Sequence, residues 1–349
     1  MRIPLFNDKV VKKYLPNYLK IDRNEIAAKF QIAKRIKANF DSSMNIQDLM
    51  KIHSKLVKKI KYKKFEKILK KDIPEKSLLD LKILIADKII EKCEFCEHKC
   101  KVNRNKQLGI CQLPNKLLIS SEFVHWGEES YFIPSHTIFF YSCNMLCKFC
   151  QNFTISYRLE KPIEITPKKL AEIIDYRRTF ENTRNLNLVG GEPTPHLNQI
   201  LKILKNVETN IPVIWNSNMY MSEISMELLN GIIDVYLADF KFGNNECARR
   251  YTIVRNYFDI ITRNLKIASK QAEIVIRHLI LPNHLECCTF KVLKWISENL
   301  KEKALVNLMD QYFPYWKAQE FPEINRRITV KEFSLALRKA LELGIAVKD

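Results

Sequence analysis

The sequence lacks any uninterrupted apolar run long enough to span a lipid bilayer. Its first residues also lack an apolar core of the length found in signal peptides. The ten cysteines are mostly grouped at C-x2-C and C-x3-C spacings, which favour metal binding over disulfides and therefore a reducing compartment. We expect a cytoplasmic protein that does not enter the membrane.

Acidic residues are scarce compared with basic ones, and the formal net charge is +19. The imbalance is greatest in residues 1–91, which hold 23 Lys and Arg against 11 Asp and Glu. Such a bias permits nucleic acid, anionic lipid or an acidic protein as a partner. Nothing else in the sequence supports a nucleic-acid partner, and we prefer the interpretation that these charges form a solvated surface. Hydrophobic residues make up 46% of the chain, so extensive disorder is not expected.

Three cysteines, Cys143, Cys147 and Cys150, follow an apolar run at 137–141 that is typical of a buried strand. Closely spaced thiolates suit soft metals and iron–sulfur clusters. A cubane [4Fe–4S] cluster usually takes four thiolates, so three would leave one iron open to a ligand. The alternatives are a zinc knuckle and loop cysteines that pack as small hydrophobic side chains.

A second motif, Gly190-Gly191-Glu192, ends the next predicted strand and should open on the same face of a parallel sheet as the cysteines. We expect the glycines to let the backbone approach a ligand and Glu192 to hold an ammonium group. The cysteine and glycine motifs together resemble those of the radical S-adenosylmethionine (SAM) superfamily. The resemblance implies a [4Fe–4S] cluster on the three cysteines, SAM chelated to the open iron, Glu192 near the SAM amino group and Phe149 near adenine.

More of the chain is similar to pyruvate formate-lyase activating enzymes, through segments at 137–140, 147–152, 190–196, 215–220, 239–241 and 277–282. This resemblance implies that Asp239 helps to hold a cation at the SAM carboxylate and that Lys241 contacts SAM. The sequence departs from that family at Asn216, where the family has an acidic residue, and at 311–312, where it has a histidine. An amide oxygen is a weaker ligand for a hard cation than a carboxylate.

The residues expected to contact the cofactor come from the ends of successive strands. They are Phe149, Gly190, Gly191, Glu192, Asn216, Ser217, Asp239, Lys241 and Arg277. Each also has a plainer interpretation, such as Asn216 satisfying turn backbone or Asp239 and Lys241 forming an ordinary ion pair. No residue is assigned as catalytic.

Four further cysteines, Cys93, Cys96, Cys100 and Cys111, form a knuckle in which Gly109 supplies a turn. Four thiolates complete the shell of a zinc ion or an auxiliary iron–sulfur cluster, so we expect a structural or electron-transfer site. Both metals fit the pattern, and His98 or His125 is a weaker alternative ligand. Cys247, Cys287 and Cys288 remain; a hydrogen-donor thiol or inert buried cysteines would explain them.

Strands predicted at 137–142, 185–189, 212–216, 232–239, 273–280 and 304–309 alternate with helices near 167–180, 197–208, 222–230, 257–269, 288–300 and 330–343. Six βα repeats predict a parallel (β/α)6 partial barrel with one open side. We expect a basic helical extension at 1–91, with helices at 24–36, 45–53 and 77–92, a knuckle and linker at 92–136, and the partial barrel at 137–349.

The resulting hypothesis is a radical SAM oxidoreductase that makes a 5′-deoxyadenosyl radical for hydrogen abstraction. The resemblance suggests that it activates a glycyl-radical partner protein and draws electrons from a donor such as flavodoxin or ferredoxin. The alternative is a non-catalytic adaptor that binds zinc together with nucleic acid or another protein. The six βα repeats and the Gly-Gly-Glu turn argue against it, because a zinc adaptor needs neither.

Overall fold

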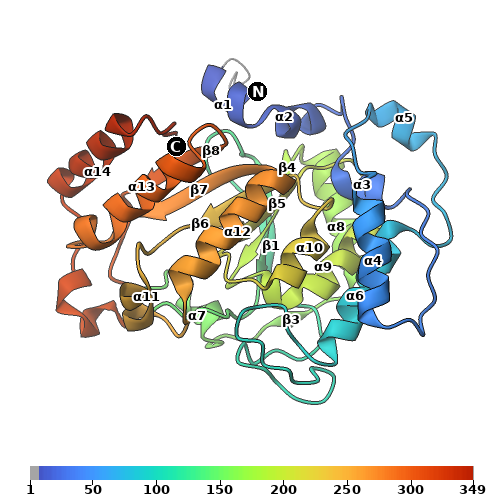
Figure 1. The fold of residues 1–349 in the computed structure, drawn as a ribbon, viewed down its shortest axis with the longest axis horizontal. Helices are drawn as coiled ribbons and strands as arrows, with labels where there is room; N and C mark the ends of the chain where they lie inside the picture. Colours follow the sequence, from blue (N-terminus) through green and yellow to red (C-terminus); the bar gives the residue numbers. More distant parts are fainter. Residues whose placement is uncertain (1–7, 349) are drawn as a thin grey trace.

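A computed structural model describes residues 8–348; residues 1–7, which contributed to the expectation about the N-terminus, lie outside this range. Its central feature is an eight-stranded sheet in the order β3-β1-β2-β4-β5-β6-β7-β8 (Figure 1). Parallel pairing joins the six strands that the sequence predicted. They are β2 (Ser135–Phe140), β4 (Asn185–Gly190), β5 (Val213–Ser217), β6 (Val235–Asp239), β7 (Glu273–Leu279) and β8 (Ala304–Met309).

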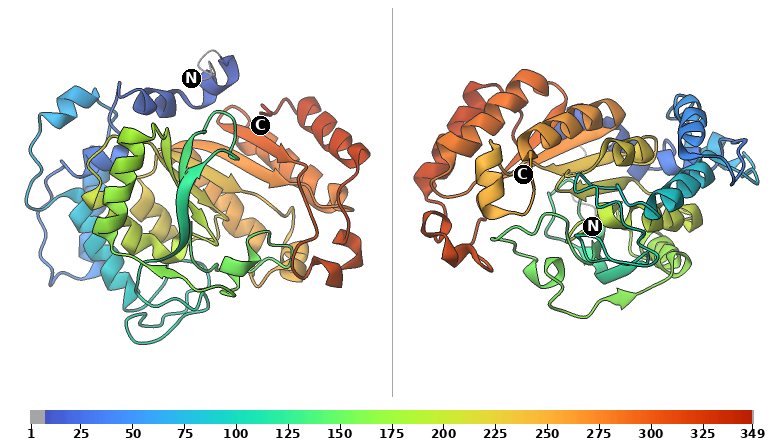
Figure 2. Two further views of the ribbon diagram at one scale, coloured as in Figure 1. Left: turned by 180° about the vertical axis from the view of Figure 1, so that it is seen from behind. Right: turned by 60° about the horizontal axis from the view of Figure 1, so that its bottom comes forward.

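Two strands were not predicted from the sequence. β1 (Leu118–His125) pairs antiparallel with β2, and the two-residue β3 (Ile163–Glu164) pairs antiparallel with β1. β1 is the long strand seen in teal in the left view of Figure 2. The segment predicted as a knuckle and linker at 92–136 thus contains β1, which lies next to the edge strand β3, and β8 forms the opposite edge of the sheet. The sheet is therefore open, as expected for a partial barrel.

Helices follow the parallel strands and cover the outer face of the sheet (Figure 1). They are α8 (Pro167–Phe180), α9 (Leu197–Asn206), α10 (Glu223–Leu229), α12 (Tyr257–Gln271), α13 (Phe290–Asn299) and α14 (Val330–Glu342). Shorter elements carry loop residues: α7 (Phe153–Ser156), α11 (Asn245–Tyr251), η2 (Thr194–His196), η3 (Leu285–Thr289), η4 (Ala318–Glu320) and η5 (Pro322–Ile324). No helix among residues 8–348 is both long and apolar enough to cross a membrane.

The N-terminal part is helical, but the helix predicted at 24–36 is largely wrong. Only Lys29–Ala33 (α3) is α-helical there, because Ile26 forms a bridge with Lys64 and the N–H of Ala28 donates to Asn210 Oδ1 at 2.8 Å. The other helices are α1 (Lys9–Tyr14), α2 (Pro16–Asp22), α4 (Ile46–Val57), α5 (Phe65–Leu69) and α6 (Leu78–Ile90). α4 and α6 lie where helices were predicted, although α4 extends beyond residue 53, and the side chains of Asn45 and Ser77 cap them.

Three buried lysines attach the N-terminal helices to the barrel. Lys29 Nζ donates to carbonyls of Ile233 and Gln271 at 2.9 and 2.8 Å, and Lys34 Nζ donates to the carbonyl that follows α9 at 2.7 Å. Lys82 Nζ donates to two carbonyls at the end of α10 and contacts Nε2 of buried His53 at 2.6 Å. Cations are favourable at helix C-termini, so part of the basic excess serves the fold instead of lying in solvent.

Candidate active site at the carboxyl ends of the strands

A cavity of about 230 Å³ opens where the parallel strands end. The loops after six strands contribute to its wall, which is why residues far apart in the sequence meet there. Its lining includes all three cysteines of the loop after β2 and most of the residues expected to contact a cofactor: Cys143, Cys147, Cys150, Phe149, Gly190, Gly191, Glu192, Asn216, Asp239, Lys241 and Arg277. Ser217 does not line this cavity but supports Glu192 from behind.

The three cysteines lie on a short loop between β2 and α7. Cys143 and Cys147 are buried, and Cys150 is half-buried. The backbone N–H of Met145 donates to Cys143 Sγ at 3.3 Å, and Cys150 Sγ contacts the hydroxyl of Ser156 at 3.4 Å. Burial raises the pKa of the Cys143 thiol to about 12. A cluster that binds here must therefore displace protons from buried thiols.

The two glycines, which line the cavity, also lie against protein backbone. A Cβ at Gly190 would lie 2.1 Å from the amide nitrogen of Phe140, and one at Gly191 would lie 2.0 Å from the carbonyl oxygen of Ser142. Gly190 also has a φ of +110°, which side chains with a Cβ rarely adopt. The glycines thus allow the loop after β4 to lie directly on the start of the cysteine loop, and this contact places Glu192 beside the cysteines.

Glu192 is buried, and its carboxylate is held by donors from two loops. Oε1 accepts from the Thr194 hydroxyl at 2.6 Å and the Ser217 hydroxyl at 2.7 Å, and Oε2 accepts from the backbone N–H of Asn218 at 2.9 Å. Burial raises the pKa of Glu192, and these hydrogen bonds oppose the rise. Oε2 accepts only one of these bonds, so it retains capacity for a donor in the cavity.

The charged pair of Asp239 and Lys241 also lines the cavity. Lys241 Nζ lies 2.5 Å from Asp239 Oδ2, and both side chains line the wall. Burial alone would lower the pKa of Lys241, but attraction by Asp239 and Cys147 outweighs it and raises the pKa. Lys241 is therefore a stable cation next to the cysteine loop.

Arg277 also reaches the cavity, but its guanidinium is held by two carboxylates. It pairs with Glu128, and its Nε and Nη2 each lie 2.6 Å from oxygens of Glu129. Burial would lower the pKa of Arg277, but these carboxylates raise it. Sequence reasoning missed Glu128 and Glu129, because they lie before the first predicted strand at 137–142, in a segment without a motif.

Two features of the wall indicate a ligand with a polar and an aromatic part. Nδ2 of Asn216 is buried and has no hydrogen-bond partner among the described residues. An unpaired buried N–H is costly, so this amide suits a ligand acceptor such as a carboxylate. The ring of Phe149 packs edge-on against Phe242 and Tyr312 at centroid distances of 6.0 and 5.8 Å, which gives the cavity one aromatic side.

The four-cysteine knuckle lies directly against the cysteine loop. Nε2 of His98 contacts the carbonyl oxygen of Asn144 at 2.6 Å, and the Ser142 hydroxyl donates to the carbonyl of Cys111 at 2.6 Å. Cys93 and Cys111 are buried, whereas Cys96 and Cys100 are half-buried. His98 is thus engaged with backbone, which agrees with the four cysteines being the better candidate ligands.

Asn218 is the clearest functional candidate outside the expected cofactor contacts. Its side chain donates to Asn144 Oδ1 at 2.9 Å and reaches Cys143 Sγ at 3.8 Å. It also lines the cavity. Its place two residues after Asn216 at a strand end was the available signal, because such positions converge on one face of a parallel sheet.

Residues 137–296 match the family model of the radical SAM superfamily. The thiols of the loop after β2 fit the iron–sulfur cluster of this class, and the Asn216 amide and the Asp239–Lys241 pair fit its SAM. Residues 137–296 therefore form a radical SAM domain. The chain is similar over nearly its whole length to protein MJ0674 of Methanocaldococcus jannaschii, with 47% identity over 336 residues, 95% of this chain and 96% of that protein.

Solved structures resemble the chain more distantly. One is Streptococcus suis SuiB bound to precursor peptide SuiA, with 15% identity, a TM-score of 0.44 and coverage of 60% of this chain and 47% of SuiB. Another is methylornithine synthase (PylB), with 13% identity, a TM-score of 0.43 and coverage of 95% of this chain and 77% of PylB.

Proposed function

We propose that this protein cleaves SAM reductively at a [4Fe–4S] cluster held by Cys143, Cys147 and Cys150. When bound, the cluster supplies one electron that splits SAM into methionine and a 5′-deoxyadenosyl radical, which removes a hydrogen atom from a substrate. The observation that carries the proposal is the meeting of three thiols, Glu192 and the Asp239–Lys241 pair in one cavity.

The residues of the cavity have separate tasks in this proposal. Oε2 of Glu192 accepts from the SAM amino group, and the free Nδ2 of Asn216 donates to its carboxylate. Lys241 adds a positive charge near that carboxylate. Phe149 offers the adenine base an aromatic edge. Gly190, Gly191 and Ser217 act indirectly, because they position Glu192, and Arg277 orders the wall through its two carboxylates.

The proposed substrate is a protein segment, such as the glycine-bearing loop of a glycyl-radical enzyme. A second cavity of about 500 Å³ adjoins the first and shares part of its wall, including Gln151, Asn216 and Gln311. Its border carries the partly exposed rings of Phe313 and Tyr315. Aromatic side chains at an open cavity suit a polypeptide better than a small polar metabolite. The electron donor would be a small protein such as flavodoxin or ferredoxin.

We also propose that Cys93, Cys96, Cys100 and Cys111 bind a second metal centre, either zinc or an iron–sulfur cluster. Its contacts through His98 and Cys111 support a role in bracing the cysteine loop or in passing electrons to it. The cytoplasm is the compartment that suits so many free thiols. The division of the chain at 91 and 136 stays a prediction.

The test is anaerobic purification, reconstitution with iron and sulfide, reduction with dithionite, addition of SAM and measurement of 5′-deoxyadenosine. The wild type should form product, and Cys147→Ser should form none and bind about four irons fewer, as expected for loss of one cubane cluster. Lys294→Met, an exposed substitution on α13, should behave as wild type, whereas Lys241→Met should raise the KM for SAM. Absence of product together with zinc at the three cysteines would favour the adaptor instead.

A further inference from the structure

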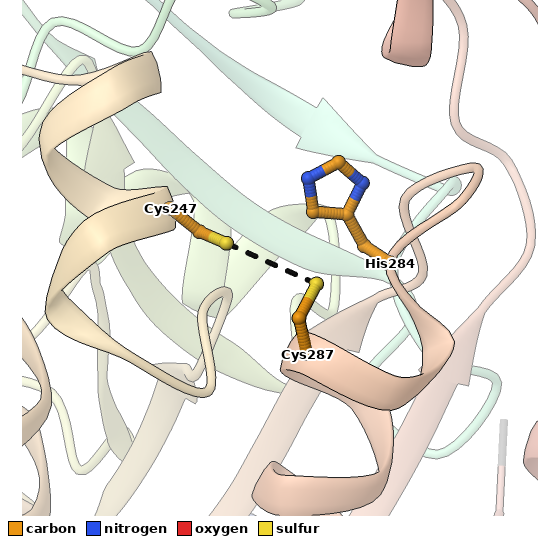
Figure 3. A group of neighbouring side chains, drawn as sticks. All are labelled: Cys247, His284 and Cys287. Carbon is orange, nitrogen blue, oxygen red and sulfur yellow. Dashed lines mark hydrogen bonds between the residues drawn. The ribbon is translucent and has the colours of Figure 1, made fainter.

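A third group of cysteines lies outside both centres described above. Cys247 is on α11, and Cys287 and Cys288 are on η3, about 40 residues later in the chain. His284 immediately precedes η3. One ligand atom each from Cys247, His284 and Cys287 lies within 4.8 Å of the others (Figure 3). The expectation of inert buried cysteines does not explain why a histidine joins them.

The sulfur atoms have the separation of a tetrahedral ion site. Cys247 Sγ lies 3.9 Å from Cys287 Sγ, and Cys287 Sγ lies 4.0 Å from Cys288 Sγ. Two sulfurs bound tetrahedrally to zinc at about 2.3 Å are about 3.8 Å apart. A disulfide would require the Cys247 and Cys287 sulfurs to approach to about 2.05 Å, so the arrangement is closer to coordination than to a covalent link.

Nε2 is the nitrogen of His284 through which an ion in this group would bind. Nδ1 of the same ring lies 2.7 Å from the carbonyl oxygen of Pro282, which can only accept, so Nδ1 carries the ring proton. The hydroxyl of Tyr251 lies 3.0 Å from Nε2 and 2.7 Å from Glu323 Oε1, to which it can donate, so a bound ion can replace Tyr251 as the partner of Nε2. A carbonyl that fixes the tautomer in this way is typical of histidines that bind metals through the other nitrogen.

Surrounding groups are arranged as expected around metal-bound thiolates. Nδ2 of Asn244 lies 3.3 Å from Cys247 Sγ and 3.8 Å from Cys288 Sγ, and it donates to the Cys287 carbonyl at 2.8 Å. Amide donors of this kind stabilise negative charge on sulfur. Gly243 lets the two segments touch, because a Cβ there would lie 2.5 Å from the carbonyl oxygen of Cys288.

We propose that Cys247, His284 and Cys287 bind one zinc-type divalent ion. Each thiol gives its proton to solvent when the ion binds, and no electron is transferred. The ion joins α11, which follows β6, to η3, which follows β7. The ring of Tyr251, next to His284, also packs edge-on against Phe149 at 6.3 Å. The site therefore braces the aromatic side of the cavity without contacting its ligand.

The test uses full-length, anaerobically reconstituted protein and Zn²⁺ as the probe. Zinc bound per chain is measured in competition with a chromophoric chelator, alongside iron and sulfide. Wild type should bind one zinc more than the Cys247→Ser/Cys287→Ser double variant, with equal iron and sulfide in both. Lys294→Met is the matched control; its side chain is exposed on α13, outside all three cysteine groups, and it should retain this zinc. Equal zinc in wild type and the double variant, or loss of iron and sulfide from the double variant, would overturn the proposal.

A readout on the wild type removes dependence on the folding of the double variant. Cys247 and Cys287 are half-buried, so an alkylating reagent can reach them. Mass spectrometry of the peptides should show at least ten-fold slower alkylation of both after addition of one equivalent of Zn²⁺. His284→Gln should lose most of that protection. Unchanged alkylation with zinc, or oxidation to a Cys247–Cys287 disulfide that zinc does not prevent, would refute the assignment. Neither measurement requires SAM cleavage.

Discussion

Replacing Gly191 with alanine should dismantle the cluster site through one contact. The added Cβ would lie 2.0 Å from the Ser142 carbonyl oxygen and 3.3 Å from the Cys143 amide nitrogen. Since real Cβ contacts are at least 3.0 Å, the two loops must separate by about 1 Å, and both atoms belong to backbone. Overpacking of this kind costs about 3 kcal/mol. For a chain of this size, that corresponds to an apparent melting temperature lower by about 4 °C.

The assay measures iron per chain after reconstitution, the apparent melting temperature and 5′-deoxyadenosine formation. We expect Gly191→Ala to lose most of the iron bound by Cys143, Cys147 and Cys150, because the first of them moves. Gly127→Ala is the matched control, since its Cβ would meet only the flexible ring of His125, at 3.2 Å. If Gly191→Ala keeps the iron content and melting temperature of this control, the steric argument is wrong.

Three further substitutions test other contacts. Glu192→Gln replaces a charged acceptor with an amide beside the buried N–H of Asn218, so the free energy of unfolding should fall by about 1–3 kcal/mol and SAM cleavage should fall at least ten-fold. The same change at exposed Glu298 should leave stability and cleavage unaffected. Equal effects of the two substitutions would contradict the role of Glu192. Burial raises the pKa of Asp234 to about 6, so its negative charge destabilises the folded state, and the free energy of unfolding should fall by up to about 3 kcal/mol between pH 4 and 6. In Asp234→Asn, the free energy of unfolding measured by chemical denaturation should change less between pH 4 and 6. An unchanged pH dependence would show that Asp234 is not its cause. His98→Ala removes the 2.6 Å contact with Asn144, so the variant should release iron to a chelator faster than wild type, and an equal rate would show that the knuckle does not brace the loop.

Much of the barrel could be predicted because its strands are short apolar runs between helical patterns. β4 and α8 begin at the predicted residues, and every motif at a strand end reached the same face, since parallel strands all point one way. β1 was missed because Ser120 and Ser121 interrupt its apolar character and its partner is an antiparallel neighbour. The helix predicted at 24–36 failed because contacts with distant residues outweighed local periodicity.

The residues of the candidate site were also predictable only in part. Residues in motifs, such as Cys143 and Glu192, were predictable because the chemistry fixes their spacing. The role of Gly191 was not, since only the structure shows that its neighbour is the Ser142 carbonyl. Likewise, no spacing connects Cys247 with His284, because two separate strand ends bring them together.

The hydrogen bonds between the four-cysteine knuckle and the cysteine loop have a consequence for the metal content of purified protein. Because His98 contacts the Asn144 carbonyl oxygen and the Ser142 hydroxyl donates to the Cys111 carbonyl, the two proposed metal centres support each other. Chelation or oxidation at one of the two centres should lower metal occupancy at both. The metal contents of the two centres should therefore rise and fall together from one preparation to the next.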